Sequence, residues 1–542
     1  MRSAGKWVFV LALVGMLTLA GIGVYNIMNG FGGSSASGAD GETAEAAEPL
    51  KEKEITTAAK SFLAAWSKGD LERAAALTDS EAAALEGLTS YRDDAHVTKA
   101  RFTTATPTGS AVPFQVRATV AYDGVSKPWT YTSRLSVVRG DVSGKPLVDW
   151  DSTVLHPDLG TGEKLATGEA AAPQVKAVDR KGRALDPAAY PSLRPVLEQL
   201  RANYGDKLSG TPGIELTIDG PEGVDSLLTL STGRPALLKT TLDRDVQAAA
   251  EKAVAKYPTA SVAAVDPATG GVLAVANTGD VDFNAAFNGG VAPGSTFKIV
   301  TAAAIFANNP SVTPATTTKC YTSFAPEQSR SFRNYEGLNG ISGDSSLALN
   351  FAKSCNTGFL SLVDEHDDVS YPDSALYDTA SRYFGLGRND WATGIKSADG
   401  GIPVDSGDFK WAAMIGQGRV TMNALNMASV SATVANGSFR QPRLVPEVGK
   451  PLAQASPLPS RIHGYLRSMM QLAVSDGTAA GLGLPGGSGA KTGTAEIAPT
   501  QSDSWFTAFR GDGRIAAAAW VQSGGHGRAA AGPIVVKVMN AR

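Results

Sequence analysis

The chain has 542 residues, of which 43% are hydrophobic and 19% charged, the balance of an ordinary globular protein. This length is enough for about three domains of roughly 100–200 residues each. A formal net charge of −3 gives no basic field for nucleic acid, and no pair among the five histidines has the spacing of metal ligands. We therefore expect no nucleic-acid partner, no metal and no cofactor.

The N-terminus combines positive charges with an apolar segment. Arg2 and Lys6 precede an uncharged apolar run over residues 7–28, which is long enough to cross a bilayer as a helix. Positive charge in the short segment before the apolar run predicts a cytoplasmic N-terminus, with the bulk of the chain outside the cell membrane. A signal peptide cleaved after residues 18–20 is the alternative, although the apolar run continues beyond that site. We expect residues 1–28 to be a cytoplasmic tail and a single-pass membrane anchor.

Two segments of different composition follow. Residues 29–50 are rich in Gly and Ser and then acidic, which predicts a flexible linker. Residues 51–157 open with an amphipathic helical pattern at 54–78. Three stretches with alternating apolar residues come next, at 111–124, 128–140 and 145–157. A helix layer on a curved antiparallel sheet is therefore predicted, which makes this part a small α+β domain.

The rest of the chain divides near residue 236. Residues 158–236 contain a helical pattern at 191–205 and two short strand candidates, which we interpret as a small connecting or dimerisation-like module. Residues 237–542 contain a hairpin pattern near each end, at 261–278 and 504–524, with helical patterns between them. The pattern predicts one antiparallel sheet flanked by helices, and hence an α+β multidomain protein.

A serine and a lysine lie three residues apart where a Pro-Gly turn leads into an Ala-rich helix. Ser295 and Lys298 would share one helical face, about 5–6 Å apart at Cβ. Burial and the positive end of a helix both lower the pKa of a lysine, so a neutral Lys298 could take the Ser295 proton and make a nucleophile. Ser-x-x-Lys is a weak pattern alone, because it recurs at residues 3–6 and 488–491.

Two further motifs follow in a fixed order, Ser354-Cys355-Asn356 and then Lys491-Thr492-Gly493-Thr494. Alone, they would read as a capped helix and a plain edge strand. The ordered triple is the pattern of penicillin-binding proteins and serine β-lactamases. In that pattern Ser354 relays a proton and Asn356 holds a substrate peptide group. A fixed positive charge on Lys491, with the hydroxyls of Thr492 and Thr494, suits a carboxylate, and Gly493 lets the backbone approach the ligand.

The similarity extends beyond these motifs. Residues 237–542 resemble the transpeptidase domain of class B penicillin-binding proteins. The segments that carry this resemblance are GGVAPGSTFKIVTAAA, SCNTGFL, GAKTGTAE and DSWFTAF. Residues 51–157 are similar to the nuclear transport factor 2-like domain of methicillin-resistance-type penicillin-binding proteins. The resemblance implies a membrane-bound peptidoglycan D,D-transpeptidase that cross-links stem peptides ending in D-Ala-D-Ala, and that β-lactams inhibit covalently.

The resemblance also implies the role of each motif. Ser295 would attack the penultimate D-Ala carbonyl, with Lys298 as base and with Ser354 and Asn356 beside it. Lys491, Thr492, Gly493 and Thr494 would bind the terminal carboxylate. The backbone N–H groups of Ser295 and Thr494 would form the oxyanion hole, and an amine of a neighbouring stem peptide would resolve the acyl-enzyme. Residues 29–236 show no glycosyltransferase signature, so the expected partner is a membrane glycan polymerase.

Other functions stay in competition. A class A β-lactamase needs a glutamate followed by an asparagine three residues on, and neither Glu365 nor Glu447 has one. A D,D-carboxypeptidase stays open, because no motif reports the acceptor site. A non-catalytic β-lactam-binding scaffold or sensor is the third alternative. The two cysteines, Cys320 and Cys355, either form a disulfide or are small buried apolar residues, and the sequence leaves both open.

Overall fold

The computed structural model describes residues 48–280, 282–327, 329–498 and 501–542. The predicted membrane anchor and nearly all of the predicted linker lie outside the described residues, so both stay predictions. Within the described ranges, no helix has the length and apolar character needed to cross a membrane. The described residues form two compact units, the first with residues 48–121, 128–165 and 219–222, and the second with 122–127, 166–218 and the described residues from 223 onwards.

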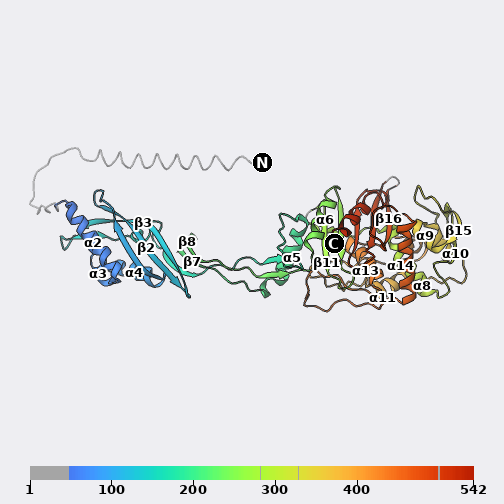
Figure 1. Cartoon of the computed structure of the whole chain (residues 1–542), viewed down its shortest axis with the longest axis horizontal. Coiled ribbons are helices and arrows are strands. Elements are labelled where there is room, and N and C mark those ends of the chain that lie inside the picture. The colour runs from blue at the N-terminus through green and yellow to red at the C-terminus, as the bar shows by residue number, and fades with distance from the viewer. Residues whose placement is uncertain (1–47, 281, 328, 499–500) are drawn as a thin grey trace, which may run out of the picture. The chain divides into compact units, whose positions relative to one another are not determined.

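The first unit is a helix layer on a four-stranded sheet (Figure 1). The helices are α2 (Glu52–Lys68), α3 (Leu71–Ala75) and α4 (Glu81–Asp93). The strands are β1 (Val97–Thr104), β2 (Ala111–Tyr122), β3 (Val125–Arg139) and β4 (Pro146–Asp149), in that order across the sheet. Alternate residues of β2 are buried, as a sheet with one covered face requires. The α+β prediction is confirmed, although the sequence analysis missed α4 and β1.

Most of the predicted connecting segment, residues 158–236, belongs to the second unit. Its helix is α5 (Arg194–Tyr204), entered by a 3-10 turn at Pro191–Leu193 and followed by another at Gly205–Lys207. Its strands are β5 (Lys164–Glu169), β6 (Lys176–Val178), β7 (Ile214–Gly220), β8 (Gly223–Ser231) and β9 (Leu237–Lys239). Strands β5, β7 and β8 form one sheet, and β6 pairs in parallel with β9. The apolar face of α5 joins the main hydrophobic core of the unit, because Val196, Leu197 and Leu200 are fully buried there.

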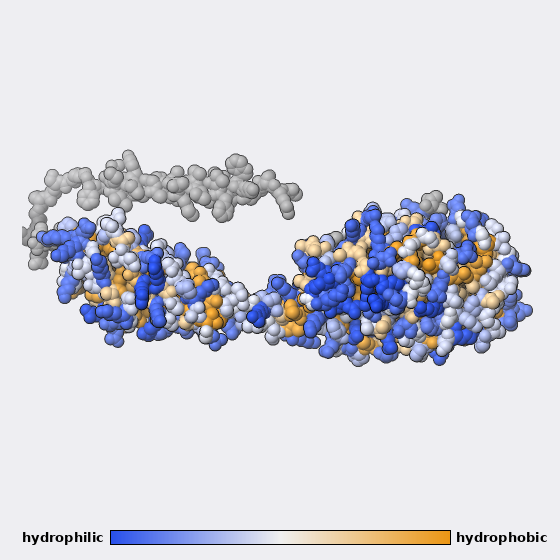
Figure 2. All heavy atoms as spheres, in the orientation of Figure 1, coloured by the Kyte–Doolittle hydropathy of each residue, from blue (hydrophilic) through white to orange (hydrophobic). Residues whose placement is uncertain are grey.

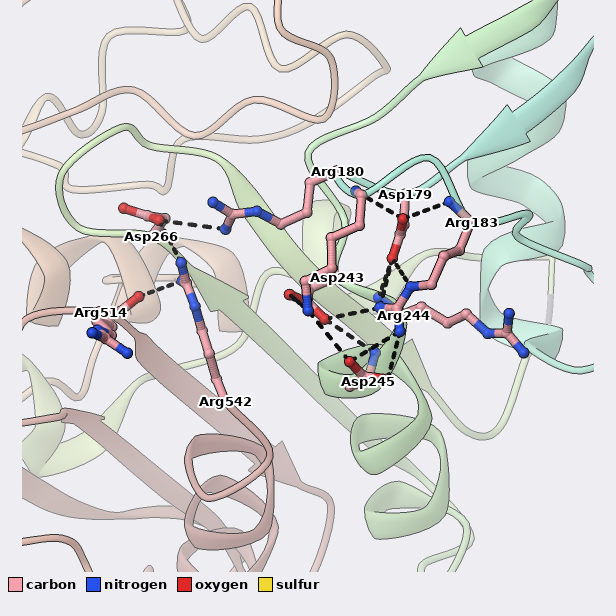
Figure 3. A network of polar contacts seen from close by, with 10 residues as sticks. Asp179, Arg180, Arg183, Asp243, Arg244, Asp245, Asp266, Arg514 and Arg542 are labelled. Atoms are coloured by element: carbon pink, nitrogen blue, oxygen red, sulfur yellow. Dashed lines mark hydrogen bonds and ion pairs between the residues drawn. The ribbon is translucent and has the colours of Figure 1, made fainter.

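A network of carboxylates and guanidinium groups attaches this segment to the following helix, α6 (Arg244–Val254) (Figure 3). Asp179 is buried and accepts hydrogen bonds from the side chain of Arg183 and from the backbone N–H groups of Lys181, Arg183 and Arg244. Burial would raise the pKa of Asp179, but these hydrogen bonds lower it overall. Arg183 also pairs with Asp245 at 2.9 Å, so the segment is fixed to the N-terminus of α6.

The core of the second unit is a five-stranded antiparallel sheet in the order β11-β10-β18-β17-β16. Its strands are β10 (Ala260–Val265), β11 (Val272–Asn277), β16 (Gly489–Ala498), β17 (Gln501–Phe509) and β18 (Ala516–Val521). Both predicted hairpins are present, as β10–β11 and β17–β18. The central strands are buried on both faces, and the outer surface seen in Figure 2 is mainly hydrophilic.

Helices cover this sheet on both sides. Helices α6 and α15 (Ala531–Met539) share a cluster with one set of sheet residues, and α13 (Ala424–Asn436) packs with α8 (Lys298–Asn308) in the other cluster. The remaining helices are α7 (Ala285–Asn288), α9 (Leu347–Lys353), α10 (Thr357–Asp364), α11 (Ala375–Phe384), α12 (Gly407–Met414) and α14 (Ser460–Ser475). Short strands complete the unit: β12 (Thr317–Cys320), β13 (Ser323–Phe324), β14 (Phe332–Arg333) and β15 (Gly343–Ser346). The predicted sheet flanked by helices is confirmed.

Candidate active site

Ser295 lies in a tight turn between a glycine and a long buried helix. The turn is a 3-10 helix, Gly294–Phe297, and α8 begins directly after it at Lys298. Ser295 therefore precedes the α-helix, whereas the sequence predicted that Ser295 and Lys298 share one face of that helix. Gly294 has φ +53°, and a Cβ there would lie 2.5 Å from the carbonyl oxygen of Thr494. Glycine thus allows the serine turn to pack directly against the edge strand β16.

Lys298 lies completely buried behind Ser295. Its Nζ donates to the backbone oxygens of Ser354 at 3.0 Å and Cys355 at 3.1 Å, and to Oδ1 of Asn356 at 2.8 Å. Burial lowers the pKa of Lys298 well below its usual range, and the nearby Lys491 ammonium lowers it further. A buried amine that loses its proton this readily can act as a base.

Asn356 connects the serine with this lysine. Its Oδ1 accepts the hydrogen bond from Lys298, and Ser295 Oγ lies 3.5 Å from the same oxygen. The Asn356 amide nitrogen donates to the backbone oxygen of Arg333 at 2.8 Å, which fixes the orientation of the amide. One side-chain oxygen therefore holds the hydroxyl and the amine at the same point, although the two groups come from opposite ends of the Ser-x-x-Lys motif.

The Ser354-Cys355-Asn356 segment is the sharp turn between α9 and α10. Ser354 ends α9 with φ +65°, a left-handed conformation that is uncommon outside glycine. Asn334 holds the other side of the turn, because its Oδ1 accepts from the backbone N–H of Asn356 at 2.7 Å and of Thr357 at 3.2 Å. A disulfide joins Cys355 to Cys320 at the end of β12, which settles the alternative that the sequence left open.

The Lys-Thr-Gly motif lies on β16, the edge strand of the sheet. Lys491 is fully buried, and its Nζ donates to Ser354 Oγ at 2.8 Å and to the backbone oxygen of Thr492 at 2.9 Å. Burial lowers the pKa of Lys491 to about 7. The positive charge expected of Lys491 stays a prediction: burial disfavours the protonated lysine, and the two acceptors around its Nζ favour it.

Gly493 packs tightly against two neighbouring segments. A Cβ at this position would lie 2.9 Å from the Pro293 carbonyl oxygen, from the Thr296 methyl group and from Cβ of Trp505. The position is thus closed by the serine turn on one side and by β17 on the other. Gly493 allows close packing of protein against protein, and the expectation that its backbone also lies close to a ligand stays a prediction.

A cavity of about 370 Å³ opens where the three motifs meet. Five of the predicted site residues line it: Ser295, Ser354, Asn356, Thr492 and Thr494. Ser295 is only 9% exposed, so its hydroxyl lies at the base of the cavity and not on the open surface. Lys298 and Lys491 are fully buried and act on the cavity through the residues in front of them.

The other lining residues were not found from the sequence. They are Tyr335, Glu336, Gly337, Ile415, Gln417, Thr478, Glu496, His526, Gly527 and Arg528. Most lie in loops without periodicity, where a single sequence offers no signal. Glu496 is the exception, because it follows Thr494 by two residues on a strand and so shares its side of β16.

Several of these loop residues support the motif residues. Thr478 Oγ1 lies 2.6 Å from Thr492 Oγ1, and His526 Nδ1 lies 3.4 Å from Thr494 Oγ1. The rings of Tyr335 and His526 pack edge-on with their centroids 5.4 Å apart. The cavity therefore has a polar floor and an aromatic side. Among the described residues, no group of three or more His, Cys, Asp or Glu side chains is placed to hold a metal ion.

Comparison with known families matches both predicted domains. Residues 260–540 match the penicillin binding protein transpeptidase domain, and residues 54–163 match the NTF2-like N-terminal transpeptidase domain. The peptidoglycan D,D-transpeptidase PbpA of Mycolicibacterium smegmatis is 28% identical over 324 residues, which is 50% of this chain and 63% of that protein. PbpA of Mycobacterium tuberculosis H37Rv is 33% identical over 149 residues, 27% of this chain and 29% of that protein. The matches thus span less than two thirds of the length of these relatives.

Solved structures show the same fold. The D,D-transpeptidase domain of a peptidoglycan glycosyltransferase from Eggerthella lenta has a TM-score of 0.51 and 21% identity, over 69% of this chain and 98% of that one. PBP2 of Pseudomonas aeruginosa, in complex with WCK 5153, has a TM-score of 0.52 and 20% identity, over 70% of this chain and 96% of that one. Because the match to the transpeptidase domain covers more than half of this chain, the chain belongs to the penicillin-binding protein transpeptidase family.

Proposed function

We propose that this protein is a peptidoglycan D,D-transpeptidase that forms an acyl-enzyme at Ser295 and is inhibited covalently by β-lactams. One observation carries the proposal: the buried amine of Lys298 and the hydroxyl of Ser295 meet at Asn356 Oδ1, at the base of the cavity. The PbpA relatives are peptidoglycan D,D-transpeptidases, which supports the same reaction here.

Acylation uses the two lysines and the two serines. The Ser295 oxygen attacks the carbonyl carbon of the penultimate D-Ala, and Lys298 takes the hydroxyl proton. The backbone N–H groups of Ser295 and Thr494 stabilise the oxyanion. As the carbon–nitrogen bond breaks, Ser354 gives its proton to the departing D-Ala amine. Lys491 supports this step, since its Nζ lies 2.8 Å from Ser354 Oγ and can return a proton to it.

The terminal carboxylate of the stem peptide binds beside β16. Thr492 and Thr494 place two hydroxyl groups on the cavity wall, and Lys491 lies directly behind them. Because the pKa of Lys491 is about 7, an arriving carboxylate favours the protonated lysine and raises that pKa. Asn356 and Gln417 also line the cavity, and their amide groups are suited to the peptide groups of the substrate.

The location outside the cell membrane is part of the proposal. Residues 1–28 anchor the chain in the membrane with a cytoplasmic N-terminus, and the catalytic domain faces the cell wall. Supporting this, the uncharged run at 7–28 has the length of a spanning helix. A membrane glycan polymerase is the proposed partner, since a transpeptidase needs glycan strands to cross-link.

Covalent labelling tests the nucleophile. A fluorescent penicillin should label the wild-type protein and should not label Ser295→Ala, and equal labelling of both would contradict the proposal. Lys298→Met keeps the buried volume and removes the amine, so it should slow acylation by about 10²–10⁴-fold, the usual scale of general-base catalysis. Lys450→Met is the matched control, because Lys450 is exposed and lies outside the cavity.

Product analysis separates a transpeptidase from a carboxypeptidase. With a thioester donor and rising concentrations of an acceptor amine, a transpeptidase forms an increasing share of the amide product. A carboxypeptidase forms only the hydrolysed donor, even at high acceptor concentration. Exclusive hydrolysis in this assay would replace the cross-linking proposal with the carboxypeptidase alternative.

A further inference from the structure

A second cavity, of about 210 Å³, lies against the central sheet of the second unit, and its wall is mainly apolar. It shares no lining residue with the catalytic cavity. We propose that this second cavity is a ligand site, which takes a small neutral apolar molecule that carries one hydrogen-bond acceptor. The site is separate from the chemistry at Ser295, so the proposal goes beyond the proposed function and does not depend on it.

One side of the cavity is a row of residues across the sheet. Trp505 on β17 lies opposite Trp520 on β18, and Trp520 lies opposite Ser261 on β10. All three line the cavity. Side chains of directly opposite residues in an antiparallel sheet share one face, so the two indoles and the serine lie side by side. A serine is much smaller than an indole, so the row provides an aromatic wall with open space next to it.

The volume and the charge of the cavity restrict the ligand. An apolar cavity of about 150 Å³ takes up benzene, so about 210 Å³ has room for one ring with a short substituent. Phe283 lines the cavity and is one of the exposed large hydrophobic side chains, so an apolar ligand would cover its ring. Asp280 is the one charged side chain among the described lining residues, and it disfavours an anion.

Trp505 brings a buried polar atom that has no partner. The residue is fully buried, and among the described residues no acceptor forms a hydrogen bond with its Nε1. The neighbouring Trp520 differs, because its Nε1 donates to Asp503 Oδ2 at 2.7 Å. Buried indole N–H groups usually have an acceptor, since leaving the hydrogen bond unmade costs free energy. A carbonyl or ether oxygen of a ligand would supply the acceptor that the protein does not.

The segment before the catalytic serine forms another part of the wall. Gly289, Gly290 and Val291 line the cavity, and Ser295 follows Val291 by four residues. Val291 exchanges backbone hydrogen bonds with Met422, at 3.1 and 2.8 Å, which holds the segment in place. A molecule in the second cavity therefore contacts the chain that leads into the serine turn without entering the catalytic cavity.

Indole N–H spectra test the proposal on the full chain with isotope-labelled tryptophan. The probes are acetophenone, which has a carbonyl oxygen, and isopropylbenzene, which has a similar shape and no such acceptor. Trp505→Phe and Trp520→Phe identify the two signals. Both probes should shift the Trp520 signal, because each places a ring in the cavity. Acetophenone should also move the Trp505 signal downfield, as a new hydrogen bond does, and isopropylbenzene should not.

Two variants separate the donor from the cavity, with affinities measured from the Trp520 signal. Trp505→Phe removes the N–H, so it should weaken binding of acetophenone relative to isopropylbenzene by about three- to tenfold, the scale of one hydrogen bond. Ser261→Leu fills the space next to the indoles and should abolish binding of both probes. Trp411→Phe is the control, because Trp411 is also buried and lies outside the cavity.

Absence of binding by either probe, or a Trp505 signal that does not move downfield with saturating acetophenone, would overturn the proposal. Equal weakening in Trp411→Phe, or undiminished binding in Ser261→Leu, would do the same. If Trp505→Phe does not fold, the wild-type titration and Ser261→Leu still decide the outcome. Acylation by a penicillin is measured separately, so failure of the proposed function and failure of this site are distinguishable.

Discussion

Lys491 Nζ donates a 2.8 Å hydrogen bond to Ser354 Oγ, while Lys298 Nζ donates to the backbone oxygen of the same serine at 3.0 Å. Two buried amines therefore approach one residue from two sides, and both have a lowered pKa because they are buried. The Lys491 charge also lowers the pKa of Lys298, so protonation of one amine opposes protonation of the other. This coupling keeps the base beside Ser295 uncharged while Lys491 carries a proton.

The coupling predicts how the acylation rate depends on pH. Only neutral Lys298 accepts the Ser295 proton, so the rate should rise with pH as this lysine deprotonates. Lys491→Met removes the positive neighbour, which raises the pKa of Lys298 and moves the rising limb to higher pH. Rates of acylation by a penicillin, measured between about pH 5 and 9, show the pH at which the acylation rate rises. A limb that stays in place or moves to lower pH would contradict the coupling.

Lys491 also predicts a dependence of stability on pH. Its pKa is about 7 in the folded protein and about 10.4 in an unfolded chain, so between these values the unfolded chain binds more protons. The stability of the wild type should therefore rise with pH across this window, as the cost of the buried charge disappears. Lys491→Met lacks this titration.

The measurable quantity is the difference in urea midpoint between Lys491→Met and the wild type. Below about pH 7 the urea midpoint of Lys491→Met should exceed that of the wild type by the largest amount. This excess should become smaller as the pH rises to about 10. Lys450→Met, which changes an exposed lysine, should show no such trend. A constant difference across the window would mean that Lys491 is not perturbed by burial.

The sequence predicted the elements with strong periodicity and the residues within motifs. The hairpins β10–β11 and β17–β18 are short apolar runs around Gly-rich turns, so the local sequence alone is enough to predict them. The motif residues Ser295, Ser354 and Thr494 line one cavity, although about 200 residues of chain separate the first from the last.

What the sequence could not predict depends on contacts between distant parts of the chain. The burial of Lys491 follows from packing against the Ser354 turn, so a motif alone gives its position and not its charge. Asn334 supports the Ser-x-Asn turn from a loop with no recognisable pattern. Gly493 is fixed by the backbone of another segment, which no local propensity reveals.

Gly294 is the position where a single methyl group should disable the site. In Gly294→Ala the new Cβ would meet the Thr494 carbonyl oxygen at 2.5 Å, and the backbone has φ +53°, which L-residues rarely adopt. The serine turn must then move away from β16, so we expect acylation to fall by at least about tenfold and stability by about 1–3 kcal/mol. Penicillin acylation rates and thermal unfolding measure the two effects. Gly486→Ala is the control, because its Cβ would meet no atom within 4 Å, and an equal effect there would remove this explanation.

The disulfide between Cys320 and Cys355 should stabilise both the domain and the Ser-x-Asn turn. It closes a loop with a sequence separation of 35, for which the loss of unfolded-state entropy corresponds to about 4 kcal/mol as an upper value. Asn334 holds the same turn by hydrogen bonds, so the reduced protein should keep its fold and bind penicillin more slowly. We expect a reductant to lower the unfolding temperature and the acylation rate of the wild type. The double variant Cys320→Ala/Cys355→Ala should show both losses without reductant and no further change with it. If the reductant affects the double variant as much as the wild type, its action does not pass through this disulfide.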